Sequence, residues 1–321
     1  MSQGEFDLVA ELRALFAEGP EGPSIRVGIG DDAAVIAGSA RQLVVSVDAQ
    51  VEHVHFERAW LTGEDIGYRA FTTALSDLAA MGAEPTAALS ALIVPAEEAG
   101  ELVRAITRGQ AEAARAYGCP MVGGNLARGP SLSVTTTVLG RVPRPLLRSG
   151  ARVGDGVFVA GALGLAAAGL RAFQLGRDRP ELAEARAAWR RPVARLDEGR
   201  TALPSAHAGI DLSDGLAQDL AHLAAESHVA IALERAALLP YADALAAAAS
   251  ALHLEASAAD ENGLGSTVDP WSWVLFGGED YSLAITAPEA PSGFVRVGSV
   301  VAGHGVSLDG SPLGPAGHRH F

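Results

Sequence analysis

Aspartates gathered in short clusters, flanked by glycine and serine, are the residues of this chain with the clearest potential for chemistry. The clusters occur at residues 28–32, 46–48, 75–77, 211–215 and 277–280. Carboxylate oxygens suit Mg²⁺, an ion that proteins usually hold with one or two carboxylates together with the phosphates of a substrate. Clusters of this kind are what a magnesium-based site for phosphate chemistry needs.

Lysine is absent from the sequence, so all 24 basic residues are arginine. A P-loop needs a lysine on the β- and γ-phosphates, and protein-kinase and Schiff-base sites need a lysine as well. These three kinds of site are therefore excluded. If the protein handles phosphate, divalent metal and arginine have to supply the positive charge.

The segment Gly28–Ala33 has the glycine spacing of a dinucleotide-binding turn, but we reject that interpretation. A helix should follow such a turn, whereas Ala37–Ser39 interrupts it and a strand begins at Leu43. Asp31 and Asp32 would also repel a pyrophosphate unless a metal ion lay between them. A tight turn with solvated aspartates is the structural alternative.

Asp211 and Asp214 lie three positions apart at an expected helix start, with Ser213 between them. Capping the helix is the commonest role of aspartate at such a position, but one carboxylate is enough for a cap. Two carboxylates could face one cation while the helix amides hold phosphate oxygens. Both alternatives stay open from this motif alone.

Several other residues are weaker candidates. Gly123–Asn125 and Gly277–Asp280 could each be an ordinary loop when taken alone. His53 and His55 lie two apart on a segment expected to be extended, which would place them on one face and suggests zinc, but no third ligand is apparent. The single cysteine, Cys119, excludes an internal disulfide and a multi-cysteine metal site.

Composition sets the class of protein. The 321 residues, of which 49% are hydrophobic and 19% charged, predict roughly two domains with sizeable cores. A net charge of −14 argues against nucleic acid and anionic membranes as partners. Residues 1–6 do not resemble a signal peptide, and the longest apolar run, 157–170, is too short to span a bilayer. We expect a cytoplasmic protein.

Hydrophobic periodicity predicts a mixture of helices and strands in both halves of the chain. The expected helices cover 5–17, 64–81, 97–117, 164–175, 216–225 and 242–254. The expected strands cover 43–48, 86–94, 131–141, 157–160, 229–233, 281–286 and 295–301. Several strands follow one another without a helix between them, which indicates α+β sheets rather than a doubly wound fold. The Pro-, Arg- and Gly-rich segment 142–156 is the expected boundary between domains 1–142 and 143–321.

Taken together, the motifs resemble the thiamine-monophosphate kinase family, part of a larger group that includes aminoimidazole ribonucleotide synthetase and selenophosphate synthetase. The similarity extends over nearly the whole chain. The segments that carry it are Leu75–Ala83, Val51–Phe56, Arg148–Ala151 and Phe276–Tyr281.

The resemblance implies an aminoimidazole ribonucleotide synthetase-like fold. Domain 1–142 would bind ATP and metal and pair in a homodimer, and the α/β domain 143–321 would close over the nucleotide. It also implies a reaction, the transfer of the γ-phosphoryl group of ATP to thiamine monophosphate, which gives thiamine diphosphate and ADP.

Site residues are implied by the same resemblance. The metal shell for several Mg²⁺ ions would consist of Asp32, Ser46, Asp48, Asp77, Asn125, Asp211 and Asp214. The residues that bind ATP would be Gly124, Asn125, Arg148 and Ser213. The substrate would meet His55 at its phosphate, Glu279 near the thiamine moiety, and His318.

Direct in-line transfer fits this set, because phosphoryl transfer needs positioning and charge neutralisation more than covalent chemistry. Asp48, Asp77 and Asp211 would act through Mg²⁺, and we predict no nucleophile on the protein. The chain departs from the family at Val47 and Ala49, where threonine is usual. It also departs at Asn125, where aspartate is frequent, and at His318, where another aromatic ring is usual.

Two alternatives remain. A related ATP-dependent synthetase is one, although selenophosphate synthetase is disfavoured because no cysteine lies near the N-terminus. A nucleotide-binding paralogue that has lost turnover through the departures at positions 47, 49 and 125 is the other.

Overall fold

The structure is a computed structural model that describes residues 14–16, 25–27, 35–36, 38–95, 99–256 and 269–314. Asp32, His318, and most of the helix predicted at 5–17 lie outside the described residues. The chain divides into two compact units. The N-terminal unit consists of Met1–Leu78 and Ala83–Pro145, and the C-terminal unit of Ala79–Gly82 and Leu146–Phe321.

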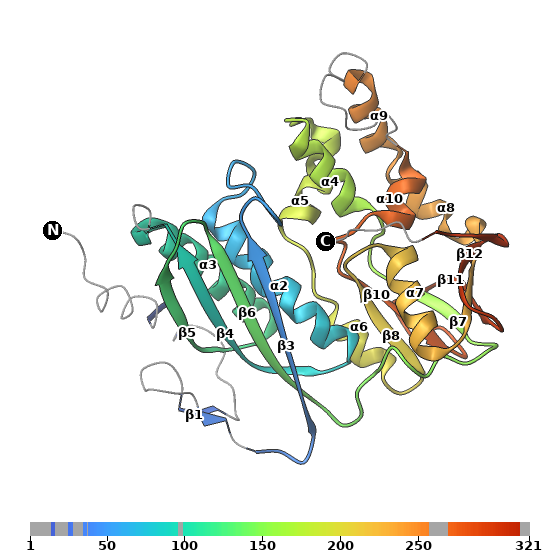
Figure 1. The fold of residues 1–321 in the computed structure, drawn as a ribbon, viewed down its shortest axis with the longest axis horizontal. Coiled ribbons are helices and arrows are strands. Elements are labelled where there is room, and N and C mark those ends of the chain that lie inside the picture. The colour runs from blue at the N-terminus through green and yellow to red at the C-terminus, as the bar shows by residue number, and fades with distance from the viewer. Residues whose placement is uncertain are drawn as a thin grey trace. The chain divides into compact units, whose positions relative to one another are not determined.

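The N-terminal unit is built on a four-stranded sheet in the order β3-β6-β4-β5. Its strands are β3 (Gln42–Val51), β4 (Glu84–Val94), β5 (Met121–Arg128) and β6 (Ser133–Val142). The helices α2 (Gly63–Ala80) and α3 (Ala99–Tyr117) cover one face of this sheet (Figure 1). The short strands β1 (Ile25–Val27) and β2 (Val35–Ile36) form a separate antiparallel pair.

Two glycines allow α2 and α3 to approach each other with their backbones almost in contact. A Cβ atom on Gly67 would overlap the carbonyl oxygen of Ile106, and one on Gly109 would overlap the carbonyl oxygen of Glu64. Glycine inside a helix lowers helix stability relative to alanine, so its presence at both positions is explained by this close crossing.

The C-terminal unit contains a seven-stranded mixed sheet in the order β13-β12-β9-β11-β7-β10-β8. Its strands are β7 (Gly156–Ala160), β8 (Ala208–Leu212), β9 (Ala230–Leu233), β10 (Ser282–Ala287), β11 (Val295–Val301), β12 (Gly305–Leu308) and β13 (Ser311–Pro312). Its helical elements are α4 (Leu165–Gln174), η2 (Pro180–Leu182), α5 (Ala183–Arg190), α6 (Leu196–Ala202), α7 (Leu216–Ser227), α8 (Arg235–Ala244), α9 (Ala246–Ala256) and α10 (Pro270–Phe276).

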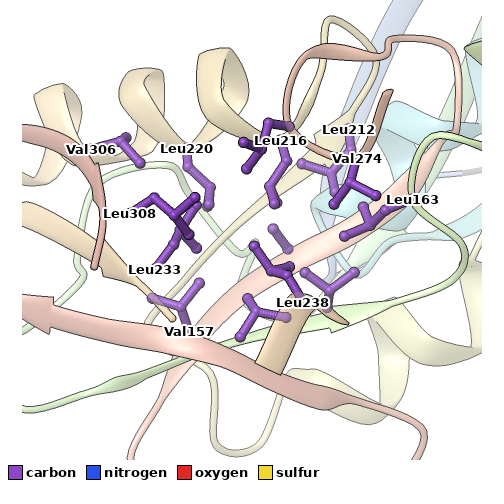
Figure 2. Packing of buried hydrophobic residues seen from close by; sticks show 14 of the residues in the cluster. Val157, Leu163, Leu212, Leu216, Leu220, Leu233, Leu238, Val274, Val306 and Leu308 are labelled. Carbon is purple, nitrogen blue, oxygen red and sulfur yellow. The ribbon is translucent and has the colours of Figure 1, made fainter. Parts of the chain in front are cut away.

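The core of the C-terminal unit is aliphatic. Leu216 and Leu220 of α7 pack among Leu212 of β8, Leu233 of β9 and Val274 of α10 (Figure 2). Burying each of these side chains contributes about 1.5–3 kcal/mol to folding. The packing fixes the end of β8 and the start of α7, between which Ser213–Gly215 lies.

The α+β class is confirmed, and most predicted elements are present. Three local predictions differ from the structure. β3 continues to Val51, so Asp48 lies inside the strand rather than at its end. Gly123–Asn125 belongs to β5, not to a loop, because it pairs in parallel with β4. The helix predicted at 242–254 is two helices, α8 and α9, and α10 and β12 were not predicted.

Two further observations bear on the sequence-based expectations. Among the described residues, the helices are too short or too polar to cross a bilayer. Cys119 is completely buried, and burial raises the pKa of its thiol to about 12.

The crossing of α2 and α3 yields a stability prediction. Gly67→Ala or Gly109→Ala is expected to lower the free energy of unfolding by about 1–3 kcal/mol or more, because the helices would have to separate. Gly100→Ala is the matched control, since this residue lies in α3 where a methyl group meets only the tip of Arg104. It should leave stability unchanged or raise it by up to about 1 kcal/mol. Urea denaturation of the three variants checks this, and equal midpoints would contradict it.

Candidate active site

A polar seam runs between β3 and α2 in the N-terminal unit. Alternate residues of a strand share one face, and Ser46, Asp48 and Gln50 all face α2. Thr73 Oγ1 donates a hydrogen bond to Asp48 Oδ2 at 2.6 Å, and Gln50 Nε2 donates to the same oxygen at 3.3 Å. Ser46 Oγ donates to Asp77 Oδ2. The seam therefore holds two carboxylates in defined orientations.

The helix side of the seam follows helical spacing. Arg69, Thr73 and Asp77 are four residues apart, so they lie along one stripe of α2. Arg69 is completely buried, and its Nε donates to Gln50 Oε1 at 3.3 Å. Burying polar and charged groups is costly unless they are paired. A seam of this composition is poorly explained by stability alone and marks a candidate functional site. Thr73 was missed by the sequence analysis, although its spacing to Asp77 was a usable signal.

The other predicted residues of the N-terminal unit lie apart from this seam. Asn125 is exposed on the edge strand β5, with β4 and β6 between it and β3. At about 4.8 Å per strand this separates Asn125 from Asp48 by roughly 14 Å. A Cβ atom on Gly124 would overlap the carbonyl oxygen of Ser90, so the neighbouring strand already accounts for this glycine.

The two histidines lie in a turn after β3, and the prediction of an extended segment there is wrong. The turn forms because the strand ends at Val51, whose N–H donates to His55 Nδ1 at 3.1 Å. His53 has a left-handed backbone with φ of 67°. Its Nδ1 lies 2.8 Å from Glu57 Oε2. Both rings are thus engaged with their own turn, which gives the zinc alternative no support.

In the C-terminal unit, two sequence clusters meet because β8 and β10 pair in antiparallel fashion, with Asp211 opposite Leu283. The N–H of Glu279 donates to the carbonyl oxygen of Ser213 at 2.7 Å, and the N–H of Tyr281 donates to that of Leu212 at 2.9 Å. The segment 211–215 is therefore clasped to the segment 277–281. We call this pair of segments the acidic clasp.

The acidic clasp has an unusual backbone. Glu279 and Tyr281 have φ angles of 68° and 49°, in the left-handed region. A Cβ atom on Gly278 would lie 2.6 Å from the carbonyl oxygen of Ser213. Non-glycine residues in sparsely populated backbone regions cost about 1–3 kcal/mol and persist where the surrounding structure imposes them. Such conformations cluster at functional sites.

Asp219, which the sequence analysis missed, lies in the first turn of α7 and binds the main chain just before the helix. Its Oδ2 accepts hydrogen bonds from the N–H groups of Asp214 and Gly215, both at 3.0 Å. Burial, together with the negative charges of Asp211 and Asp214, raises the pKa of the Asp219 carboxyl to about 8. An acidic residue in the first turn of a helix was the available signal.

One of the two alternatives for this helix start is corrected. Neither Asp211 nor Asp214 caps α7, because Asp211 is a buried residue of β8 and the N-cap residue is Gly215, with no side-chain cap. The other alternative, that amides at the start of the helix hold phosphate oxygens, stays a prediction. The side chain of Asp214 accepts a hydrogen bond from Gln218 Nε2 at 3.1 Å.

The second segment of the clasp is anchored by side chains as well. Asp280 Oδ2 accepts from the N–H of Gly164 at 2.5 Å and Oδ1 accepts from that of Ala166 at 3.0 Å, so this carboxylate covers the N-terminus of α4. Burial raises the pKa of the Asp280 carboxyl to about 7. The indole Nε1 of Trp189, in α5, donates to Glu279 Oε2.

Arg148 is not brought to the acidic clasp. Its carbonyl oxygen accepts from Ser227 Oγ at 2.7 Å, and this hydroxyl also accepts from the N–H groups of Gly150 and Ala151. Ser227 is the last residue of α7, a helix of 12 residues that begins at the clasp. At 1.5 Å per residue, the exposed Arg148 lies about 18 Å from Asp214 along this helix.

The donor chemistry fits Mg²⁺. Within the described ranges, no group of three or more His, Cys, Asp or Glu side chains is arranged to hold a metal ion. Two carboxylates nevertheless belong to each candidate site, Asp48 and Asp77 to the polar seam and Asp211 and Asp214 to the clasp. Mg²⁺ takes one or two carboxylates and completes its shell with phosphate and water oxygens, so such pairs suffice. Burial is the main cause of the raised pKa of Asp219, and the nearby negative charges of Asp211 and Asp214 raise it further.

The fold and these sites define a class. Residues 30–142 match the family model of the AIR synthase related protein, N-terminal domain. The thiamine-monophosphate kinase of Mycobacterium tuberculosis (strain ATCC 25618 / H37Rv) is 36% identical over 325 residues, which cover 99% of this chain and 92% of that protein.

Two solved structures agree over the full length. The crystal structure of thiamine-monophosphate kinase from Stenotrophomonas maltophilia K279a has a TM-score of 0.81 and 33% identity, and covers 98% of this chain and 99% of its own. The structure of AaThiL complexed with AMPPCP and TMP has a TM-score of 0.77 and 30% identity. The match covers 99% of this chain and 97% of the AaThiL chain. The chain belongs to the thiamine-monophosphate kinase family. The resemblance seen in its motifs, and the kinase class that the resemblance implies, are confirmed.

Asp280 makes stability depend on pH. Its carboxyl titrates near pH 7 in the folded protein and near 3.8 in the unfolded chain. The protonated form therefore favours folding, and this contribution is lost as the pH rises from about 4 to about 7. Its loss lowers the free energy of unfolding by up to about 1.4 kcal/mol per pH unit. Asp280→Asn should remove this dependence of the free energy of unfolding on pH, as measured by urea denaturation at pH 5, 6, 7 and 8.

The control for this series is Asp197→Asn, because Asp197 is an exposed residue that pairs with Arg200 at the surface. It should keep the slope of the unchanged protein. Asp219, whose pKa is also raised, is present in the parent protein and in both variants, so its pH-dependent contribution to stability is the same in all three. Parallel curves for Asp280→Asn and the unchanged protein would contradict the assignment.

Proposed function

We propose that this protein transfers the γ-phosphoryl group of ATP to thiamine monophosphate, giving thiamine diphosphate and ADP. The observation that carries the proposal is the full-length similarity to a relative solved with AMPPCP and TMP. The absence of lysine and the paired carboxylates of both units are consistent with it, because they suit a metal-assisted transfer rather than a P-loop reaction.

We infer that Mg²⁺ assists the reaction. Asp48 and Asp77 of the polar seam, with Ser46, and Asp211 and Asp214 of the acidic clasp would hold the ions. Bound Mg²⁺ neutralises charge on the transferring phosphoryl group. The hydroxyls of Ser46 and Thr73 orient the seam carboxylates before substrate arrives. Asp32 and Asn125 remain predicted ligands.

The acceptor is itself a phosphate and is largely ionised near neutral pH, so the protein needs neither a nucleophile nor a strong general base. Direct in-line transfer follows, with the chain supplying positioning. Gly124, Arg148 and Ser213 are proposed to contact ATP. We propose that His55 meets the substrate phosphate, while Glu279, with His318, lies at the positively charged thiamine moiety.

Phosphorus NMR of the purified protein with ATP, excess Mg²⁺ and thiamine monophosphate tests the proposal. Equal amounts of thiamine diphosphate and ADP are expected, and a sample without acceptor should show neither. ADP with inorganic phosphate but no thiamine diphosphate would overturn the acceptor and indicate a related synthetase. An unchanged spectrum, with retained ADP binding, would indicate a paralogue without turnover.

Two variants probe the proposed metal residues. Asp48→Ala and Asp211→Ala are each expected to lower kcat by at least about 100-fold, since both remove charge stabilisation from the transferring group. Asp197→Ala is the control, because this exposed aspartate pairs only at the surface with Arg200. Circular dichroism should show all three folded. Near-normal turnover in both site variants would contradict their assignment.

The N-terminal unit is proposed to form a homodimer through the sheet face that its helices leave open. Val45 and Val47 of β3 point away from α2 and are 57% and 61% exposed. Leu43, on the same face of β3, is also exposed. Grouped exposed apolar side chains of this kind mark interfaces.

Val45→Asp is therefore expected to convert a dimer into monomers at micromolar concentration, because a carboxylate would be buried in the interface. Val153→Asp, at an equally exposed valine of the C-terminal unit, is the control and should remain dimeric. Analytical ultracentrifugation of the three proteins decides. A monomeric parent protein, or a dimeric Val45→Asp variant, would refute this interface.

A further inference from the structure

The hydrogen bond from Trp189 to Glu279 links two segments that are 90 residues apart in sequence. We propose that Trp189 is a positioning residue that orients the Glu279 carboxylate toward the cationic ring of thiamine monophosphate. This inference rests on the function proposed above and adds a residue that determines affinity for the acceptor.

The burial of Trp189 is the first step of the argument. Its side chain is completely buried, and an indole has a single polar atom, Nε1, which only donates. A buried donor needs an acceptor, and in this fold the acceptor is Glu279 Oε2. The bond is charge-assisted, so it is shorter and stronger than a bond to a neutral carbonyl.

The ring of Trp189 is itself fixed. Phe173 of α4 packs against it with ring centroids 5.2 Å apart and an interplanar angle of 50°. The guanidinium of Arg186 lies 4.6 Å from the centre of the Phe173 ring and pairs with Asp178. Helices α4 and α5 thus hold the indole in one orientation, and the indole transmits that orientation to the carboxylate.

The main chain of Glu279 is fixed at the other end. Its N–H donates to Ser213 at 2.7 Å, and its φ of 68° is imposed by the clasp. Both ends of the side chain are therefore held before substrate binds. Pre-orientation of this kind raises affinity because the cost of ordering the side chain is not incurred on binding. A purely structural role, in which Glu279 only satisfies the indole, would give no such gain.

Four proteins distinguish a positioning role of Trp189 from a purely structural one. They are the parent, Trp189→Phe, Glu279→Gln and the double variant. Phenylalanine keeps the aromatic packing on Phe173 and removes the donor. Glutamine keeps an acceptor oxygen and removes the charge. Trp271→Phe is the matched control, because the ring of Trp271 packs under the guanidinium of Arg235, at 4.2 Å.

Steady-state kinetics, with each substrate varied in turn, give KM for thiamine monophosphate and for ATP. Calorimetry in the presence of a non-hydrolysable ATP analogue gives Kd for thiamine monophosphate. Trp189→Phe should raise KM and Kd for thiamine monophosphate about tenfold and change KM for ATP less than about twofold. In the double variant, Trp189→Phe should raise KM for thiamine monophosphate less than about twofold above that of Glu279→Gln, because the carboxylate that Trp189 orients is already absent. Trp271→Phe should match the parent.

Equal increases in both KM values, or independent effects of the two substitutions, would overturn the inference. If Trp189→Phe fails to fold, NMR of the parent protein gives a second measurement, because it can follow the indole N–H signals of the 4 tryptophans. The signal that moves in Glu279→Gln should also move on addition of thiamine monophosphate, and its failure to move would refute the inference. A parent protein that makes no thiamine diphosphate refutes the proposed function, whereas an active parent with an unchanged Trp189→Phe refutes this inference alone.

Discussion

The antiparallel pairing of β8 with β10 is the contact on which the chemistry of the C-terminal unit depends. It brings together two acidic segments that lie far apart in sequence, and it does so with main-chain hydrogen bonds on Ser213 and Leu212. Because β8 and β10 are held by the sheet on one side and the aliphatic core on the other, like charges can be kept close. Repulsion between them is then opposed by the packing of the entire unit, not by local contacts.

The absence of lysine shapes both units in the same way. In both candidate sites, hydroxyl, amide and main-chain groups orient carboxylates. In the polar seam these groups are Ser46 and Thr73, and in the acidic clasp they include Gln218. Burial raises the pKa of the Asp219 carboxyl, and the negative charges of Asp211 and Asp214 add to this effect. Such carboxylates suit the cations of the proposed function, Mg²⁺ and the charged ring of thiamine monophosphate.

The sequence predicted the α+β class, most strands and helices, and the residues of the clasp, because hydrophobic periods and Gly-flanked aspartates are local signals. It did not predict that Asp219 would bind the main chain of Asp214 and Gly215, since this contact depends on where the chain enters the helix. It expected an extended segment at His53 and His55 because nothing local marks the turn that follows β3. The link between Trp189 and Glu279 was also out of reach, because it arises only when α5 packs beside the clasp.

The burial of Cys119 has a practical consequence. With its thiol pKa raised to about 12 and no lysine in the sequence, the chain has neither a reactive thiol nor a side-chain amine at neutral pH. Reagents directed at either group would find little to modify in the folded protein. A single cysteine introduced at an exposed position outside the proposed dimer interface, such as Val153, would therefore carry a fluorophore or spin label without background, and no existing residue would have to be removed first.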